Sequence, residues 1–72
     1  MELGDALRMI QENIGCAYEM EIVPQCTDGA ITYRATLRDE YGECADGVGS
    51  DMVEAISNLA GNFWDWLEHQ TE

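Results

Sequence analysis

Three cysteines and one histidine are the residues of this chain best suited to metal binding or nucleophilic chemistry. Cys16, Cys26 and Cys44 contain no C-x-x-C pair, and their spacing with His69 matches no common zinc pattern. Cys44 has acidic neighbours, which disfavour a reactive thiolate. No serine or cysteine motif accompanies His69, which is placed to cap the end of a helix. The sequence therefore indicates three reduced thiols, no metal site, no cofactor and no enzymatic activity.

Carboxylates are the second chemical resource of the chain. Fifteen Asp and Glu residues face three arginines and no lysine, which gives a formal net charge of −12. Nucleic acids and anionic membrane surfaces are bound largely through Lys and Arg, so this charge argues against both as partners. We expect a partner protein with a basic surface, which such a field attracts over long range. The alternative is that the charge only keeps the chain in solution.

Six of these carboxylates lie close together in the sequence. One interpretation is an anionic patch that fills a basic groove as phosphates would; the other is a solvated loop with ordinary helix-cap acids. A calcium loop does not fit, because the D-x-[DN]-x-[DN]-G spacing is absent. Trp64 and Trp66 point roughly 200° apart on a helix, so one of them lies at a rim, either as an interface anchor or as a cover between the helices. The candidate partner-binding residues are Asp39, Glu40, Glu43, Asp46, Asp51, Glu54 and Trp64.

The elements that position these residues follow from hydrophobic periodicity. Apolar residues recur every three or four positions in 2–14, which predicts a helix, with Gly15 as its left-handed C-cap. Alternation predicts a strand over 17–23 that ends at Pro24, and Asp28-Gly29 supplies the turn.

Cleaner alternation predicts a second strand over 30–38, and a weaker pattern predicts a third over 43–48. On the outward face of the sheet, we expect cross-strand pairs between the glutamates and arginines, and this open face is an alternative docking surface. The residues concerned are Glu19, Glu21, Arg34 and Arg38.

A long helix follows the third strand. Ser50 or Asp51 caps it, and the spacing from Asp51 to Glu54 is that of a capping box. Its apolar stripe is wide enough to face both a sheet and a neighbouring helix. Gly61 lies inside this helix, and we expect it to mark a close approach to the first helix.

The predicted fold is α+β, with the order α-β-β-β-α over a single domain of residues 1–72 and both helices on one face of a three-stranded antiparallel sheet. This order resembles the double-stranded-RNA-binding domain. That family places a basic cluster at the start of its last helix, where this chain has Ser50, Asp51 and Glu54. The resemblance therefore implies the fold and does not extend to RNA binding.

Residues 31–68 are similar to part of the HicB-type antitoxins. The resemblance implies a module that binds a small partner protein, although HicB proteins usually lack a leading helix. The similar positions are Tyr33, Ala35, the stretch from Gly42 to Gly47, Glu54-Ala55, Asn58-Leu59 and Trp66-Leu67-Glu68.

In its size, charge and topology the chain also resembles some phage anti-CRISPR proteins, which present carboxylates where phosphates would lie. From this resemblance and the charge we expect a small acidic inhibitor that binds a basic nucleic-acid-processing protein; a HicB-like antitoxin or regulatory module is the alternative. We expect a monomer or homodimer. The N-terminus is polar by its second residue and no apolar run has transmembrane length, so we expect a cytoplasmic protein, in the host cytoplasm if phage-encoded.

Overall fold

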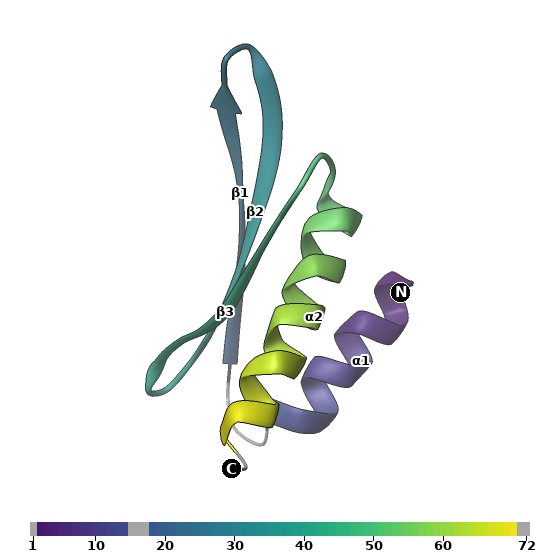
Figure 1. The fold of residues 1–72 in the computed structure, drawn as a ribbon, viewed down its shortest axis with the longest axis vertical. Helices are drawn as coiled ribbons and strands as arrows, with labels where there is room; N and C mark the ends of the chain where they lie inside the picture. The colour runs from purple at the N-terminus through teal and green to yellow at the C-terminus, as the bar shows by residue number, and fades with distance from the viewer. Residues whose placement is uncertain (1, 15–17, 71–72) are drawn as a thin grey trace.

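The computed structural model describes residues 2–14 and 18–70 and has the predicted element order (Figure 1). Gly15 and Cys16, for which the sequence predicted a helix cap and a reduced thiol, lie outside the described residues. The α-β-β-β-α prediction is confirmed. The elements are α1 (Leu3–Ile14), β1 (Tyr18–Thr27), β2 (Ala30–Asp39), β3 (Gly42–Gly49) and α2 (Met52–Gln70).

The three strands form an antiparallel meander in the order β1-β2-β3. The β1–β2 turn consists of Asp28 and Gly29, whose φ angles of 52° and 78° belong to a type I′ turn. That turn type matches the right-handed twist of the strands and fixes their register, in which Thr27 is opposite Ala30.

Strand β1 continues through Pro24 to Thr27, so the prediction that it ends at Pro24 is wrong. In a two-residue hairpin the pair next to the turn is hydrogen-bonded, and hydrogen-bonded and non-hydrogen-bonded pairs then alternate. Counting from Thr27 places Pro24, opposite Tyr33, in a non-hydrogen-bonded pair. The missing N–H of Pro24 therefore faces the free edge of the sheet, where it costs no ladder hydrogen bond.

Both helices lie on the same side of the sheet (Figure 1). The other side carries one of the predicted pairs, Arg38 with Glu21 at 3.3 Å; Arg34 instead forms a salt bridge with Asp46 of β3 at 2.6 Å, which the sequence did not predict. The core between sheet and helices is completely inaccessible to solvent at Ala6, Ile10, Ala35, Leu37, Ala55, Leu59, Ala60 and Phe63.

Two glycines of β3 allow α2 to lie directly on the strand. A Cβ added to Gly47 would lie 2.5 Å from the carbonyl oxygen of Ala55, and one added to Gly49 would lie 2.5 Å from the nitrogen of the same residue. Any side chain at either position would therefore push helix and strand apart.

Two asparagine side chains also connect α2 to β3. The amide of Asn58 donates to the carbonyl of Val48 at 2.7 Å, and the amide of Asn62 donates to the carbonyl of Asp46 at 2.6 Å. Along β3, residues that are hydrogen-bonded to β2 alternate with residues that are not, and Asp46 and Val48 belong to the second group. The carbonyl groups of Asp46 and Val48 therefore point away from β2, toward the free edge of the sheet. Side chains of α2 thus satisfy two carbonyl groups on the outer edge of β3.

The prediction that Gly61 marks a close approach to α1 is wrong. A Cβ at this position would meet no atom of another described element within 4 Å, so Gly61 is not a close-approach point against α1. The sequence predicted that a glycine of the helix would allow a close approach. In the structure, the glycines that allow a close approach lie on β3, the strand that α2 covers.

The β1–β2 hairpin extends beyond the rest of the molecule. The pairing of β2 with β3 ends at Tyr33, opposite Gly49, whereas its pairing with β1 continues to the turn. We call residues 24–32 the distal arm. It projects past the start of α2 (Figure 1) and contributes to a long axis of 41 Å, compared with 25 and 22 Å in the other directions.

Candidate protein-binding surface

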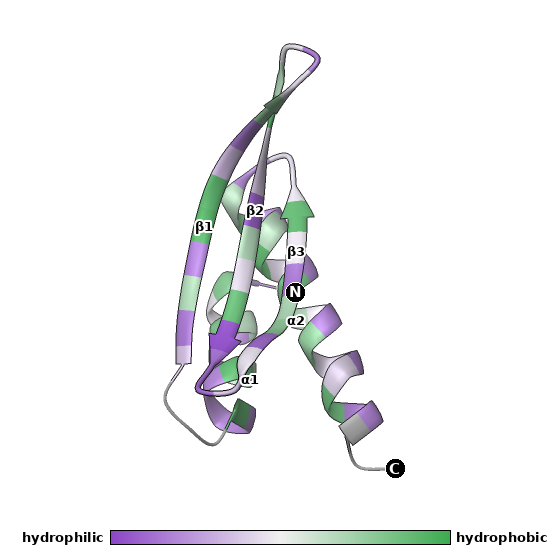
Figure 2. Ribbon diagram, turned by 90° about the vertical axis from the view of Figure 1, so that its left-hand side faces the viewer, coloured by the Kyte–Doolittle hydropathy of each residue, from purple (hydrophilic) through white to green (hydrophobic). Residues whose placement is uncertain are grey.

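The turn between β2 and β3 gathers three of the predicted acidic residues. We call Asp39, Glu40, Tyr41 and Glu43 the acidic turn. The N–H of Tyr41 donates to Oδ1 of Asp39 at 2.8 Å, and Gly42 adopts a φ of 130° that favours glycine. The chain reverses here because Asp39 bonds the backbone two residues on. Figure 2 shows the hydrophilic colour of this end of the sheet.

The carboxyl group of Asp39 is held in its charged form. The backbone N–H of Tyr41, followed by the side chain of Cys44, lowers its pKa from the ordinary value. Cys44 itself is buried, and its Sγ lies 3.9 Å from the carbonyl oxygen of Gly42. This thiol therefore supports the turn from inside and is not presented to solvent.

Tyr41 is the aromatic residue of the acidic turn, and 88% of its surface is exposed. Two shallow depressions of 330 and 340 Å³ flank the turn, and both include Asp39. The first is lined by Tyr18, Glu19, Arg38, Asp39 and Glu40; the second by Asp39, Tyr41, Gly42, Glu43, Cys44 and Trp66. An exposed aromatic ring between carboxylates is suited to a guanidinium group, which can stack on the ring and bond the acids.

Asp51 and Glu54 lie at the opposite end of β3 from the acidic turn, where α2 begins. Oδ1 of Asp51 accepts from the N–H of Glu54 at 2.7 Å. Glu54 reaches back to Ser50, accepting from its N–H at 3.3 Å and from its hydroxyl at 3.1 Å. The two carboxylates are therefore engaged in the predicted cap, with the return bond made to the residue before Asp51.

Asp46 lies on the outer face of the sheet, where Arg34 neutralises it. An eight-residue strand is roughly 25 Å long, so the acids at its two ends cannot meet the same small site. The six predicted acids consequently do not form one patch. Only Asp39, Glu40 and Glu43 gather at one turn.

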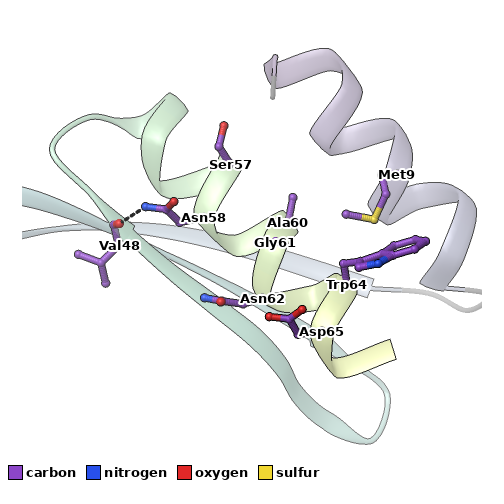
Figure 3. Close-up of a pocket in the computed structure, with 9 residues that line it drawn as sticks. All are labelled: Met9, Val48, Ser57, Asn58, Ala60, Gly61, Asn62, Trp64 and Asp65. Atoms are coloured by element: carbon purple, nitrogen blue, oxygen red, sulfur yellow. Dashed lines mark hydrogen bonds between the residues drawn. The ribbon is translucent and has the colours of Figure 1, made fainter. Parts of the chain in front are cut away.

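Trp64 lines a separate open groove of about 880 Å³ on the outer side of α2 (Figure 3). Its ring points toward Met9 of α1 and is 47% exposed, whereas Trp66 stacks on Phe63 with ring centroids 5.8 Å apart. The prediction that one tryptophan lies at a rim is confirmed. The groove is lined by Met9, Val48, Ser57, Asn58, Ala60, Gly61, Asn62, Trp64 and Asp65.

Sequence reasoning did not single out Tyr41. Its position in the sequence indicated that it would be exposed. The turn D-E-Y-G-E contains no other apolar side chain that could cover an aromatic ring. Exposure of a large aromatic ring among acids was therefore readable from the turn itself.

The described residues contain no group of three or more His, Cys, Asp and Glu side chains placed to hold a metal ion. Nδ1 of His69 lies 2.7 Å from the carbonyl oxygen of Asp65, one turn earlier in α2, and its role as a cap of the helix end stays a prediction. Within residues 2–14 and 18–70, neither helix is long and apolar enough to cross a membrane.

Comparisons of the chain with protein-family models, with curated proteins and with solved structures found no match. The resemblances to HicB-type antitoxins and anti-CRISPR proteins therefore stay predictions from the sequence.

Proposed function

We propose that this chain is a small acidic inhibitor that binds a basic, nucleic-acid-processing partner protein through the acidic turn. The observation that carries the proposal is the acidic turn itself, in which three carboxylates lie within two residues of a tyrosine that is 88% exposed. Bound to a basic groove, these carboxylates would occupy positions that phosphates otherwise take.

The arginines of the chain leave these carboxylates available. Arg34 and Arg38 form salt bridges on the outer face of the sheet, with Asp46 and Glu21. Among the described residues, no salt bridge involves Glu40 or Glu43. Both acids can therefore pair with an incoming cation without first breaking an internal ion pair.

The chemistry of the acidic turn favours arginine over lysine in the partner. A guanidinium group can stack on the ring of Tyr41 and donate in parallel to a carboxylate, whereas an ammonium group is a compact charge that stays hydrated. The rest of the acidic surface adds long-range attraction, which raises the association rate and falls with salt.

Arginine and lysine octapeptides are suitable probes, because they isolate the chemistry from the identity of the partner. We expect the wild-type chain to bind the arginine peptide more tightly at about 50 mM salt than at about 300 mM. The double variant Glu40→Gln/Glu43→Gln should lose about tenfold in affinity, at roughly 0.7 kcal/mol for each exposed pair. Tyr41→Ala should weaken the arginine peptide more than the lysine peptide.

The matched control is Glu2→Gln/Glu12→Gln, which removes the same charge from two exposed positions at and near α1. It should change the affinity by less than about twofold, since it alters only the long-range field. Equal losses in the two double variants would show that net charge alone attracts the peptide, and would refute the acidic turn as the site. Tight binding of DNA or RNA at physiological salt would overturn the proposed function as a whole.

A further inference from the structure

The outer edge of β1 carries backbone groups that no described residue bonds. Strand β1 lies at one margin of the sheet and has only β2 as a hydrogen-bonded neighbour (Figure 2). Hydrogen-bonded and non-hydrogen-bonded pairs alternate along β1, and Tyr18, Met20 and Ile22 belong to pairs of the second kind. Each of these three residues therefore directs its N–H and its C=O away from β2, toward the free edge.

This free edge has a defined length. Pro24 has no N–H to offer, and the distal arm begins there. Residues 18–23 span about 20 Å at roughly 3.3 Å per residue, which matches an added strand of about six residues. A row of unbonded N–H and C=O groups binds an extended segment of another chain, which adds a strand to the sheet. The backbone of β1 therefore selects an extended strand as the occupant.

The side chains of β1 select the residues of that strand. Glu19 and Glu21 are exposed on the outer face of the sheet, and among the described residues only Glu21 has a salt bridge, with Arg38. Met20 and Ile22 point to the other face, where they are partly buried and pack against the core. Cross-strand pairs of opposite charge and of apolar side chains stabilise a sheet. The strand that fits therefore alternates basic with apolar residues.

The free edge of β1 is continuous with the acidic turn. Tyr18 lies opposite Asp39, and the depression of 330 Å³ joins the two strands at this point. Tyr18 and Glu19 line it from β1, and Asp39 and Glu40 line it from the acidic turn. A basic strand along β1 would therefore reach the acidic turn with one of its ends.

A second copy of the chain does not fit this edge. Antiparallel pairing of two β1 strands would place Glu19 and Glu21 of both copies on one face of a joint sheet, where neighbouring like charges oppose pairing. Charged side chains and a proline on an edge strand are common means by which a sheet avoids pairing with its own copy. The same glutamates attract a basic strand, so the edge distinguishes between the two.

We propose that the free edge of β1, at residues 18–23, adds an extended strand of the partner in which arginines alternate with apolar residues, and that one arginine enters the acidic turn. This inference rests on the proposed function, because it names the segment of the basic partner that the acidic turn receives. Backbone hydrogen bonds supply affinity that depends little on salt, and the carboxylates supply the preference for basic residues.

Methylation of backbone nitrogens in a peptide tests the proposal. The probe is a hexapeptide of alternating arginine and valine, titrated into the full chain at about 50 mM salt. Every second N–H of an added strand faces β1, so either the arginine or the valine nitrogens donate to it, but not both. Methylation of the donating set should weaken binding at least about tenfold, and methylation of the other set is the matched control, with less than about a threefold change. Equal affinity of the two methylated peptides would overturn the proposal.

Amide hydrogen exchange of the chain provides a second measurement. The N–H groups of Met20 and Ile22 should exchange more slowly when the unmethylated peptide is bound, because they gain acceptors. The N–H groups of Glu19 and Glu21 already bond β2 and serve as the internal control. A bound peptide that left the exchange of Met20 and Ile22 unchanged would contradict strand addition.

The double variant Glu40→Gln/Glu43→Gln separates this inference from the proposed function. If methylation had no effect while the double variant weakened binding, strand addition would be refuted and the acidic turn would stand. If one methylated peptide lost affinity while the double variant bound as tightly as the wild type, the edge of β1 would be the site and the acidic turn would not.

Discussion

Adding one methyl group to Gly47 tests how closely α2 lies on β3. The new Cβ would be 2.5 Å from the carbonyl oxygen of Ala55 and 2.7 Å from Cα of Leu59, well inside the roughly 3.5 Å at which nonbonded atoms attract. Both contacts are with helix backbone, which cannot rotate away as a side chain can. The helix must therefore move outward by about 1 Å.

That movement affects more than the local packing. Overpacking alone costs about 1–3 kcal/mol. A helix displaced by this amount also lengthens the hydrogen bonds that Asn58 and Asn62 make to β3, each of which contributes about 1 kcal/mol. The total of about 3–5 kcal/mol equals the entire stability that a domain of 72 residues usually has.

Urea unfolding followed by circular dichroism and tryptophan fluorescence measures the loss. We expect Gly47→Ala to be largely unfolded without denaturant. The same substitution at Gly61 is the control, because its Cβ enters open space and the helix gains about 1 kcal/mol, or about 4–8 °C in Tm. If Gly47→Ala retained wild-type stability within about 0.5 kcal/mol, the close seam between α2 and β3 would be refuted.

Further predictions concern single polar side chains. Asn62→Ala should lose about 1 kcal/mol in urea unfolding and speed hydrogen exchange in β3, because the carbonyl of Asp46 loses its donor; unchanged exchange would contradict this. Asp51→Ala should lose about 1 kcal/mol of unfolding free energy through the helix cap, and a variant as stable as the wild type would show that Asp51 does not cap α2. The pKa of Asp39 is lowered in the folded chain, so its stabilising contribution is complete above the pKa of the unfolded chain and disappears as the pH falls through the folded pKa. The difference in urea midpoint between wild type and Asp39→Asn should therefore shrink below about pH 4, and a difference independent of pH would refute the role of this carboxylate.

The order of elements was predictable because each has a strong local signal. Alternation along β2 and the helical repeat in α1 and α2 each appear within one element. The turn at Asp28-Gly29 was likewise readable from its two residues, since few others adopt two positive φ angles in succession.

The wrong predictions depended on pairings between elements. Pro24 normally ends a strand, and only the register with β2 shows that its missing N–H faces outward. The sequence alone does not distinguish Gly61 from Gly47. Only the packing of α2 on β3 shows which of the two leaves no room for a side chain. Register and packing arise from contacts across the chain, which periodicity within one segment does not contain.

The candidate site was predictable in part for the same reason. Asp39, Glu40 and Glu43 were placed together correctly, because a tight turn keeps sequence neighbours close. Asp51 and Glu54 were grouped with them because they are near in the sequence. In the structure, the extended strand β3 separates these two residues from the acidic turn. Their caps were predicted correctly, since a capping box lies within four residues.

The seam between α2 and β3 has a consequence for how the domain comes apart. The sequence of β3, with three glycines and few β-branched residues, has little strand preference of its own. Its outer carbonyls and its tight contacts both depend on a helix that follows it in the chain. The third strand and the second helix therefore act as one cooperative unit, and a ribosome must release the residues of α2 before either can become stable.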